Sequence, residues 1–241
     1  MLKNCRARTK PEIRMVKLKD HLKFVDKYYS TLSVDERSRA DRFTIKNVRE
    51  RFIVSRALLR TLIAKKIGIK TNAIVFAYGP HGKPQLDAVM TGISLKEPFH
   101  FNVSHSKSMV LFCFGLLPVG ADIEFVRKLN NPDRIAQRII SKRKLKIFRS
   151  LPLKMRHEVL LQIWTRKESI VKALGCGLTI PVKNFEVWTG SKADPLSFAR
   201  RVEIPDERFG DLIIESLALK LPKTYVGAVS FICGNKQKDN P

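Results

Sequence analysis

The chain has 241 residues, 44% of them hydrophobic and 28% charged, a composition that fits one large or two small globular domains and excludes a disordered chain. With 46 Lys and Arg against 22 Asp and Glu, its formal charge is +24. That charge predicts an anionic partner but does not choose among nucleic acid, an acidic protein, a phosphorylated small molecule and an anionic membrane surface. The four cysteines form no CxxC pair, and no apolar run is long enough to span a bilayer, so we expect a soluble cytoplasmic protein with no membrane partner.

The first part of the chain predicts a long helix followed by short strands. The helix is expected over residues 35–66, with Ser33 as N-cap, Glu36 three residues later and Gly68 as the stop. The segments expected next are a strand at 74–78, a GPHGKP turn, a strand at 99–103, a loop at 104–108 and a strand at 110–115.

The second part of the chain repeats this pattern of helix, glycine and strand. The segments expected are a strand at 119–126, a basic helical stretch at 134–156 with nine Lys or Arg, a helix at 157–175, and strands at 185–188 and 225–233. Chance explains such an echo about as well as a duplication does. The duplication hypothesis predicts an α+β fold of two pseudo-symmetric halves, 1–118 and 119–241, that form one catalytic unit with the site in the cleft between them.

Two carboxylates lie on one face of the strand VGADIEFV. Asp122 and Glu124 are two residues apart, so their side chains point to the same side. They are either solvated on an exposed strand face or placed around a cation, and Mg²⁺ is the hard ion that carboxylates and phosphate oxygens share. The apolar neighbours on both sides of the pair do not favour an exposed face, and the two interpretations remain equally open.

The helix after residue 157 carries charges on or beside its apolar stripe. Lys167 falls on the stripe, and Glu168 and Lys172 lie on its flank one turn apart. An ordinary Glu–Lys pair four residues apart is the alternative interpretation. Three charges on a face that should pack favour a site, where Glu168 supplies a third carboxylate for Mg²⁺.

Two loops offer groups suited to phosphate. The segment NVSHSKS places Ser104 beside His105, which suits donation to a phosphate better than a nucleophile–base pair and equally suits a polar turn. The GPHGKP turn has two glycines and Lys83 but lacks the spacing of a P-loop.

Four motifs together resemble a known family. HGKP, FNVSHS, VGADIE and WTRKESIVKALG occur in that order, and the likeness extends from Arg37 to Gly177. In this order they resemble the signature elements of the Sfp-type (surfactin-type) 4′-phosphopantetheinyl transferases.

The resemblance implies two pseudo-symmetric halves with coenzyme A between them. It also implies Mg²⁺-dependent transfer of the phosphopantetheine arm to a serine of an apo acyl or peptidyl carrier protein, with release of 3′,5′-ADP. Asp122, Glu124 and Glu168 resemble the metal ligands and Glu168 the base, while Lys172 resembles the cation on the pyrophosphate. The coenzyme A contacts implied are Arg39, Arg51, Gly82, Lys83, Pro84, Ser104, His105 and Lys172.

Two departures from the family pattern concern binding rather than the reaction. Lys144 stands where an acid is frequent, and Glu36 stands where some members have a cation. The basic stretch at 134–156 could steer an acidic carrier protein or be an ordinary solvated face. We expect a monomer. The rival hypotheses are a basic nucleic-acid-binding protein without catalysis, which leaves the carboxylates unexplained, and an inactive member of the family.

Overall fold

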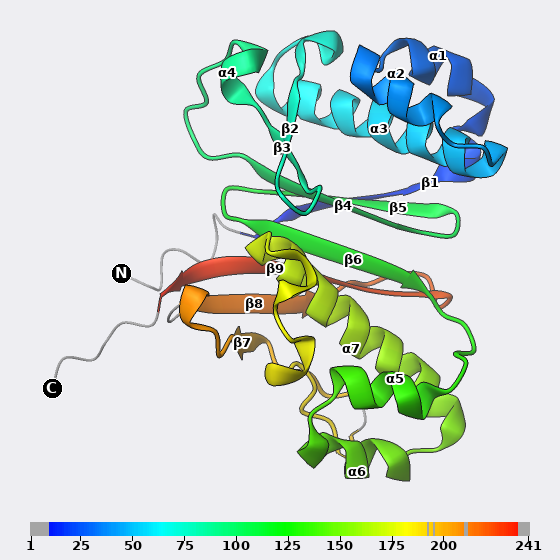
Figure 1. Ribbon diagram of the computed structural model, residues 1–241, viewed down its shortest axis with the longest axis vertical. Coiled ribbons are helices and arrows are strands. Elements are labelled where there is room, and N and C mark those ends of the chain that lie inside the picture. The colour runs from blue at the N-terminus through cyan, green and yellow to red at the C-terminus, as the bar shows by residue number, and fades with distance from the viewer. Residues whose placement is uncertain (1–9, 192, 195, 210–211, 236–241) are drawn as a thin grey trace, which may run out of the picture.

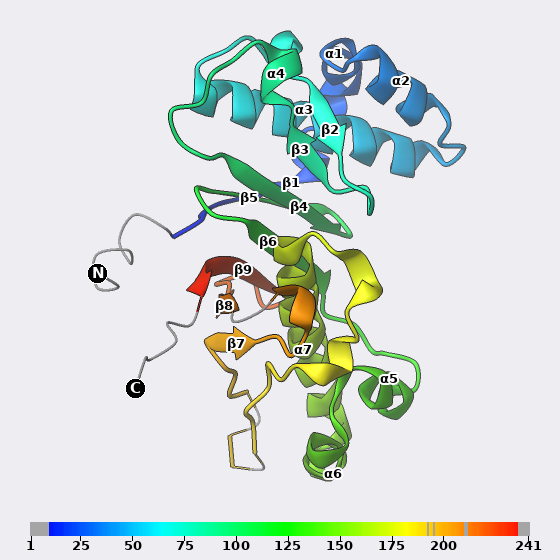
Figure 2. The same cartoon turned by 60° about the vertical axis from the view of Figure 1, so that its left-hand side comes forward.

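The computed structural model describes residues 10–191, 193–194, 196–209 and 212–235, and its mixed helices and sheets confirm the α+β class. Four layers stack along the long axis in Figure 1: helices, a sheet, a second sheet, and helices again. The N-terminal helices cover the outer face of the first sheet, and the long helix of the second half covers the outer face of the second sheet, as Figures 1 and 2 show.

The first half contains a three-stranded sheet, a two-stranded hairpin and the upper helices. Its elements are β1 (Glu12–Lys17), α1 (Val25–Ser30), α2 (Val34–Asp41), α3 (Lys46–Ile67), β2 (Phe76–Tyr78), β3 (Pro84–Leu86), α4 (Ala88–Thr91), β4 (His100–Ser106) and β5 (Met109–Gly115). The sheet order is β1-β5-β4, and all its neighbours are antiparallel.

The second half contains a four-stranded antiparallel sheet and the lower helices. Its elements are β6 (Val119–Phe125), α5 (Pro132–Ile139), α6 (Lys142–Ser150), α7 (Leu153–Leu174), β7 (Arg201–Glu203), β8 (Leu212–Ala218) and β9 (Tyr225–Asn235). The sheet order is β6-β9-β8-β7.

The two halves share one chain path. In each half one sheet strand comes before the 22-residue helix and the last two strands come after it, and in each sheet the last strand lies between the first strand and the second-last one. The strands β1, β4 and β5 thus have the same positions as β6, β8 and β9. The boundary at residues 118/119 stays a prediction, whereas this repeated order is an observation.

Strand β5 lies between two parts of the core, and six of its seven residues are buried. Its side chains point alternately into one part and the other. Val110, Phe112 and Phe114 pack with the buried face of α3. The alternate residues, Met109 and Cys113 among them, pack against the second sheet. A strand buried on both faces reads as a continuous apolar run, as this one does, and it explains how two sheets can stack without a helix between them.

The expected single helix over residues 35–66 is wrong, because the chain breaks into α2 and α3. The predicted capping box is present: Ser33 and Glu36 bond reciprocally at the start of α2. After Asp41 the chain turns, and α3 starts from Ile45 in extended conformation. The turn lets Ala40 of α2 and the preceding Leu32 form one buried apolar cluster with Ile53 and Ala57 of α3. Gly68 ends α3 in the left-handed region, as predicted.

Three other expected segments are also corrected. The basic stretch at 134–156 forms α5, α6 and the first residues of α7, since Ile140 is extended and Pro152 cannot continue a helix. The expected strand at 185–188 makes one isolated bridge, between Trp188 and Phe198. The expected loop at 104–108 is a strand up to residue 106, because β4 stays paired with β5 until a tight turn begins at Lys107.

Candidate active site

The two halves meet where side chains of β4 bind the open edge of β6. Three amides of this edge strand donate to side chains rather than to another strand. Ala121 N donates to Asn102 Oδ1 at 3.0 Å, Ile123 N to Ser104 Oγ at 3.3 Å and Phe125 N to Ser106 Oγ at 3.0 Å. These bonds satisfy the edge and fix the register between the two sheets.

The same hydroxyls hold the carboxylates of β6. Ser104 Oγ donates to Asp122 Oδ1 at 2.8 Å, and Ser106 Oγ donates to Glu124 Oε2 at 3.0 Å. Arg127 also donates to Glu124 Oε2, at 2.8 Å. Ser104 is therefore buried and engaged within the protein. Its contact with coenzyme A stays a prediction.

Gly120 lets α7 lie directly on β6. A Cβ at this glycine would come within 2.1 Å of Ser169 O and 2.3 Å of Ala173 N, and neither backbone atom can move aside. This close approach brings Lys172 Nζ to 2.6 Å from Asp122 Oδ1. The glycine of the VGADIE motif thus sets the distance between helix and carboxylate.

Glu168 stands one turn before Lys172 on the same helix. Burial raises its pKa, Lys172 opposes that rise, and the nearby charges of Asp122 and Glu124 add to it. Burial is also the main cause that raises the pKa of Asp122. The three carboxylates therefore repel one another in a poorly solvated place.

The chemistry of the three carboxylates, but not their spacing in this structure, suits a hard divalent cation. Asp122 Oδ2 is buried and has no hydrogen-bond partner within the described part of the chain. Oxygen ligands of this kind, next to a place for phosphate, are what Mg²⁺ prefers. Among the described residues the side chains are not gathered tightly enough to count as a group of three or more metal ligands, and Asp122 Oδ1 is bound by Lys172.

The β2–β3 hairpin reaches across to α7 through Lys83. Lys83 Nζ donates to the carbonyls of Val119, at 3.1 Å, and Lys172, at 2.5 Å. Burial lowers the pKa of Lys83 to about 8. A cavity of about 290 Å³ lies here between the halves, lined by the hairpin residues Gly82 to Pro84 and by Glu168 and Lys172. The side chain of Lys83 is thus occupied in joining the halves.

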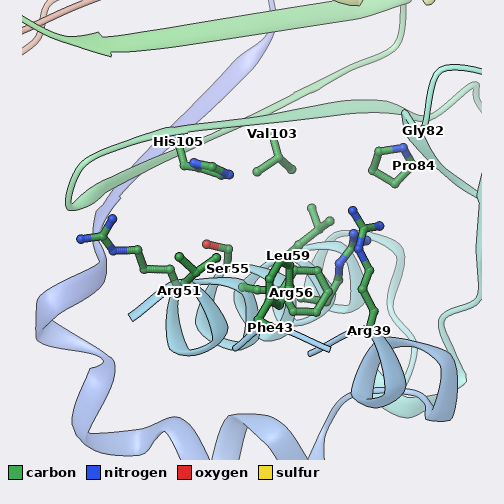
Figure 3. Close-up of a pocket in the computed structure, with 12 residues that line it drawn as sticks. Arg39, Phe43, Arg51, Ser55, Arg56, Leu59, Gly82, Pro84, Val103 and His105 are labelled. Carbon is green, nitrogen blue, oxygen red and sulfur yellow. The ribbon is translucent and has the colours of Figure 1, made fainter. Parts of the chain in front are cut away.

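A larger cavity of about 500 Å³ opens above β4, between this strand and α3 (Figure 3). It brings together five predicted binding residues: Arg39, Arg51, Gly82, Pro84 and His105. Burial lowers the pKa of His105, and the cations Lys172 and Arg51 lower it further. The surroundings of this cavity are therefore strongly positive, as a site for an anion requires.

Two polar residues of this cavity were not predicted from the sequence. Ser55 and Arg56 lie on α3, four and five residues after Arg51, and both line the cavity. Helical spacing from Arg51 could have indicated Ser55 on the same face. Arg56 gave no separate signal, because the sequence does not say which of the many arginines of this helix is buried.

Two cations singled out in the sequence, Lys167 and Lys144, have structural partners, and so does a third buried cation, Arg166. Lys167 is buried and donates to the carbonyls of Val182 and Phe185, so it leaves the site to Glu168 and Lys172. Lys144 donates to the carbonyls of Thr189 and Gly190. Arg166 donates to Ser216 O at 2.9 Å.

Models of known protein families match both halves of this chain. Residues 21–113 match the family model for the N-terminal part of 4′-phosphopantetheinyl transferases, and residues 118–220 match that of the 4′-phosphopantetheinyl transferase superfamily. The chain belongs to this superfamily. The two matches cover both halves of the fold, and with them the hairpin, β4, β6 and α7 that form the site.

Individual proteins that are similar to this chain are also named 4′-phosphopantetheinyl transferases. The chain is 32% identical over 150 residues to the 4′-phosphopantetheinyl transferase HetI of a Nostoc strain, an alignment that covers 62% of each chain. It is 28% identical to a putative 4′-phosphopantetheinyl transferase of Synechocystis, over 63% of this chain and 60% of that one. It is 27% identical to the 4′-phosphopantetheinyl transferase Sfp of Bacillus subtilis, over 67% and 68%.

The alignments thus span about three fifths of the first two relatives' own length. Within the described residues, no helix has both the length and the apolarity needed to cross a membrane.

Proposed function

We propose that the protein transfers the 4′-phosphopantetheine arm of coenzyme A to a serine of an apo carrier protein and releases 3′,5′-ADP. The observation that carries the proposal is the meeting of Glu168 and Lys172 with Asp122 beside a cationic cavity. Acidic groups for a metal and a proton, and basic groups for phosphates, are what phosphoryl transfer requires. A nucleic-acid-binding role would leave this buried acidic cluster without a use.

Asp122, Glu124 and Glu168 are the residues that would hold Mg²⁺. The bound ion supplies charge neutralisation at the diphosphate. Two features of this chain favour the assignment: the unpartnered Asp122 Oδ2 within the described residues, and the mutual repulsion among the three carboxylates. Ser104 and Ser106 would hold two of them in place, since each hydroxyl is itself fixed by an amide of β6.

Glu168 is proposed to take the proton from the carrier serine. Its raised pKa brings it nearer to the working pH, which makes it a better base than an exposed carboxylate. Lys172 is proposed to face the leaving pyrophosphate, where negative charge grows as the bond to phosphorus breaks. The adenine side of coenzyme A would lie against Gly82 and Pro84, with Arg39, Arg51 and His105 for its 3′-phosphate.

The carrier protein is proposed to be acidic around its serine. A chain of charge +24 attracts such a surface and rejects a basic one. The basic helices α5 and α6 lie at the far end of the second half in Figure 1, beyond α7. They would act on the approach of the carrier rather than at the cavity. A monomer in the cytoplasm is part of the same proposal.

The experiment is incubation with coenzyme A, Mg²⁺ and a panel of apo carrier proteins, followed by intact-protein mass spectrometry. The expected result is the added mass of one phosphopantetheine group on at least one carrier. No mass shift on any carrier from the same host, with a control transferase active on the same panel, would sink the proposal. Salt-sensitive duplex DNA binding without coenzyme A binding would favour the nucleic-acid hypothesis instead.

A further inference from the structure

Helix α7 contains a buried arginine, Arg166, whose side chain points to the sheet and not to the cleft between the halves. Its Nη1 donates to Ser216 O at 2.9 Å, and Ser216 Oγ and Ala199 O each lie 3.4 Å from the same nitrogen. The ring of Phe198 faces the guanidinium, with its centroid 4.7 Å from Cζ. These contacts fix the plane of the guanidinium and use one of its nitrogens.

The positive charge of Arg166 has no counter-ion within the described residues. Only 8% of this residue is exposed. Burial lowers the pKa of Arg166 to about 10, and no acidic group of the described chain opposes that shift. A buried charge without a partner of opposite sign costs free energy, so buried arginines in proteins are usually paired.

The other two nitrogens of this guanidinium, Nε and Nη2, have no acceptor in the part of the chain that the structure describes. Neither of them is enclosed, in contrast to the buried Asp122 Oδ2. Nε and Nη2 form the edge of arginine that donates two parallel hydrogen bonds to a carboxylate. Arg166 therefore presents an anion-binding edge that the described residues leave free.

A cavity of about 380 Å³ lies beside this arginine, between α7 and the connection from β8 to β9. Arg166 lines it together with Glu158, Gln162 and Thr165 of the same helix and Lys223 of the connection. The cavity shares no lining residue with the two cavities at the cleft, and all its lining residues belong to the second half. It is thus a place separate from the proposed active site.

The residues around the cavity favour a ligand with a single negative charge. The exposed Lys223 adds a second cation to the wall. Glu158, also exposed, would repel a ligand that carries two negative charges, such as a phosphomonoester. Leu219, Leu221 and Val226 contribute to the same wall, so a short apolar tail can be accommodated there.

We infer that this cavity binds a small monocarboxylate, with its two oxygens on Nε and Nη2 of Arg166 and a short apolar tail along the wall. The ligand would supply the counter-ion that the described chain does not. The inference does not depend on the proposed function, because no part of coenzyme A lies at this site in that proposal.

The test observes the Nε–H group of Arg166 in ¹H–¹⁵N correlation spectra of the full chain. Butyrate is titrated at constant ionic strength, and butyramide, which has the same shape without the charge, is titrated in parallel. Saturating 3′,5′-ADP is present to occupy the cationic cavity above β4. The signal is assigned by its loss in Arg166→Met, and we expect butyrate to shift it to a plateau while butyramide leaves it unmoved.

Two variants measure the contribution of the arginine and of the cavity. Arg166→Met is expected to weaken butyrate binding by about tenfold or more, followed on the backbone amides of Thr165 and Gly227. Ala218→Phe keeps Arg166 and fills the cavity with a ring, since Ala218 is exposed at the end of β8 and lines the cavity. It is expected to weaken butyrate binding by about fivefold or more, and it tests the inference if Arg166→Met does not fold.

Arg138→Met is the matched control, because Arg138 lies exposed on α5 and does not line the cavity. It should bind butyrate as the unchanged protein does, and thermal unfolding identifies which variants are folded. Equal responses to butyrate and butyramide would overturn the inference, and so would unchanged butyrate binding by a folded Arg166→Met or Ala218→Phe variant. Shifts that grow without a plateau on all exposed arginines would show screening of surface charge alone and would also overturn it.

Discussion

Helices α3 and α7 are the same element used twice for different purposes. Each has 22 residues, lies on the outer face of its sheet and ends at a glycine in the left-handed region, Gly68 at φ 74° and Gly175 at φ 72°. Helix α3 presents arginines to the 500 Å³ cavity, whereas α7 presents Glu168 and Lys172 to the carboxylates of β6.

The comparison shows that the two helices pack on their sheets in the same way, whereas a few polar residues on each helix determine its role. Both helices also bury cations that serve the fold alone: Arg60 in α3 and Lys167 in α7, each bound to backbone carbonyls. A buried cation is therefore not by itself a sign of a site. Asp122 differs from these cations, because its buried Oδ2 has no hydrogen-bond partner among the described residues.

The largest expected effect is on the α7 side of this comparison. Glu168→Gln keeps the shape of the side chain and removes the proposed base, so we expect kcat to fall by about 10³-fold with little change in the KM for coenzyme A. Steady-state kinetics on a carrier that accepts the group would measure both. Glu158→Gln, an exposed position on the same helix, is the control and should be unchanged. If instead only the KM for coenzyme A rises and kcat is unchanged, Glu168 binds coenzyme A and is not the base.

The contact between α7 and β6 can be broken without touching a charged residue. Gly120→Ala forces a Cβ into the backbone of Ser169 and Ala173, so we expect a loss of about 3 kcal/mol in the free energy of unfolding. Gly79→Ala is the control, because its Cβ would meet nothing closer than 3.8 Å. Urea unfolding of both variants decides the matter, and equal stabilities would contradict the close packing.

A substitution on α3 is expected to have a smaller effect, which changes the KM for coenzyme A rather than kcat. Arg51→Met removes an exposed cation from the cavity, and we expect the KM for coenzyme A to rise by about tenfold while kcat at saturation holds. Lys65→Met, exposed on the same helix, should leave both constants unchanged. A fall in kcat with KM constant would show that the division of tasks between the two helices is wrong.

The link between the halves predicts a small effect of pH. The pKa of Lys83 lies at about 8 instead of its ordinary 10.5 because of burial, so from about pH 8 to 10.5 the unfolded chain binds more protons at this lysine. Stability contributed by Lys83 therefore rises with pH across that window. Relative to Lys83→Met, the unchanged protein should gain about 1–2 kcal/mol between pH 7.5 and 10 in urea unfolding. Relative to Lys65→Met, a variant of an exposed lysine that keeps Lys83, the unchanged protein should show no such gain.

Local features of the fold could be predicted from the sequence. The capping box at Ser33, the glycine stops at Gly68 and Gly175, and the strand that carries Asp122 and Glu124 depend on a few neighbouring residues. The charges on the apolar stripe of the helix suggested Glu168 as a partner of this strand, and the family resemblance implied the same pairing.

Features that depend on distant partners could not be predicted. The hydroxyl of Ser104 bonds to β6 because two sheet edges meet, and the ammonium of Lys83 reaches a carbonyl 89 residues later in the chain. The break after Asp41 follows from the packing of α2 on α3. Arg56 and Arg60 have the same residue type and helix face in the sequence, and only the structure separates them, because Arg60 donates to Glu36 and Arg56 lines the cavity.

The most direct test of the account uses Asp122→Asn, which removes the carboxylate charge where the two halves meet and keeps the side chain's size. Two quantities are measured. The first is the rate of phosphopantetheine transfer to an accepting apo carrier protein, followed by intact-protein mass spectrometry, and the second is the Kd of 3′,5′-ADP without metal. The account predicts that transfer is lost while nucleotide binding stays within about threefold of the unchanged protein. Transfer at an undiminished rate by the folded variant would contradict the account.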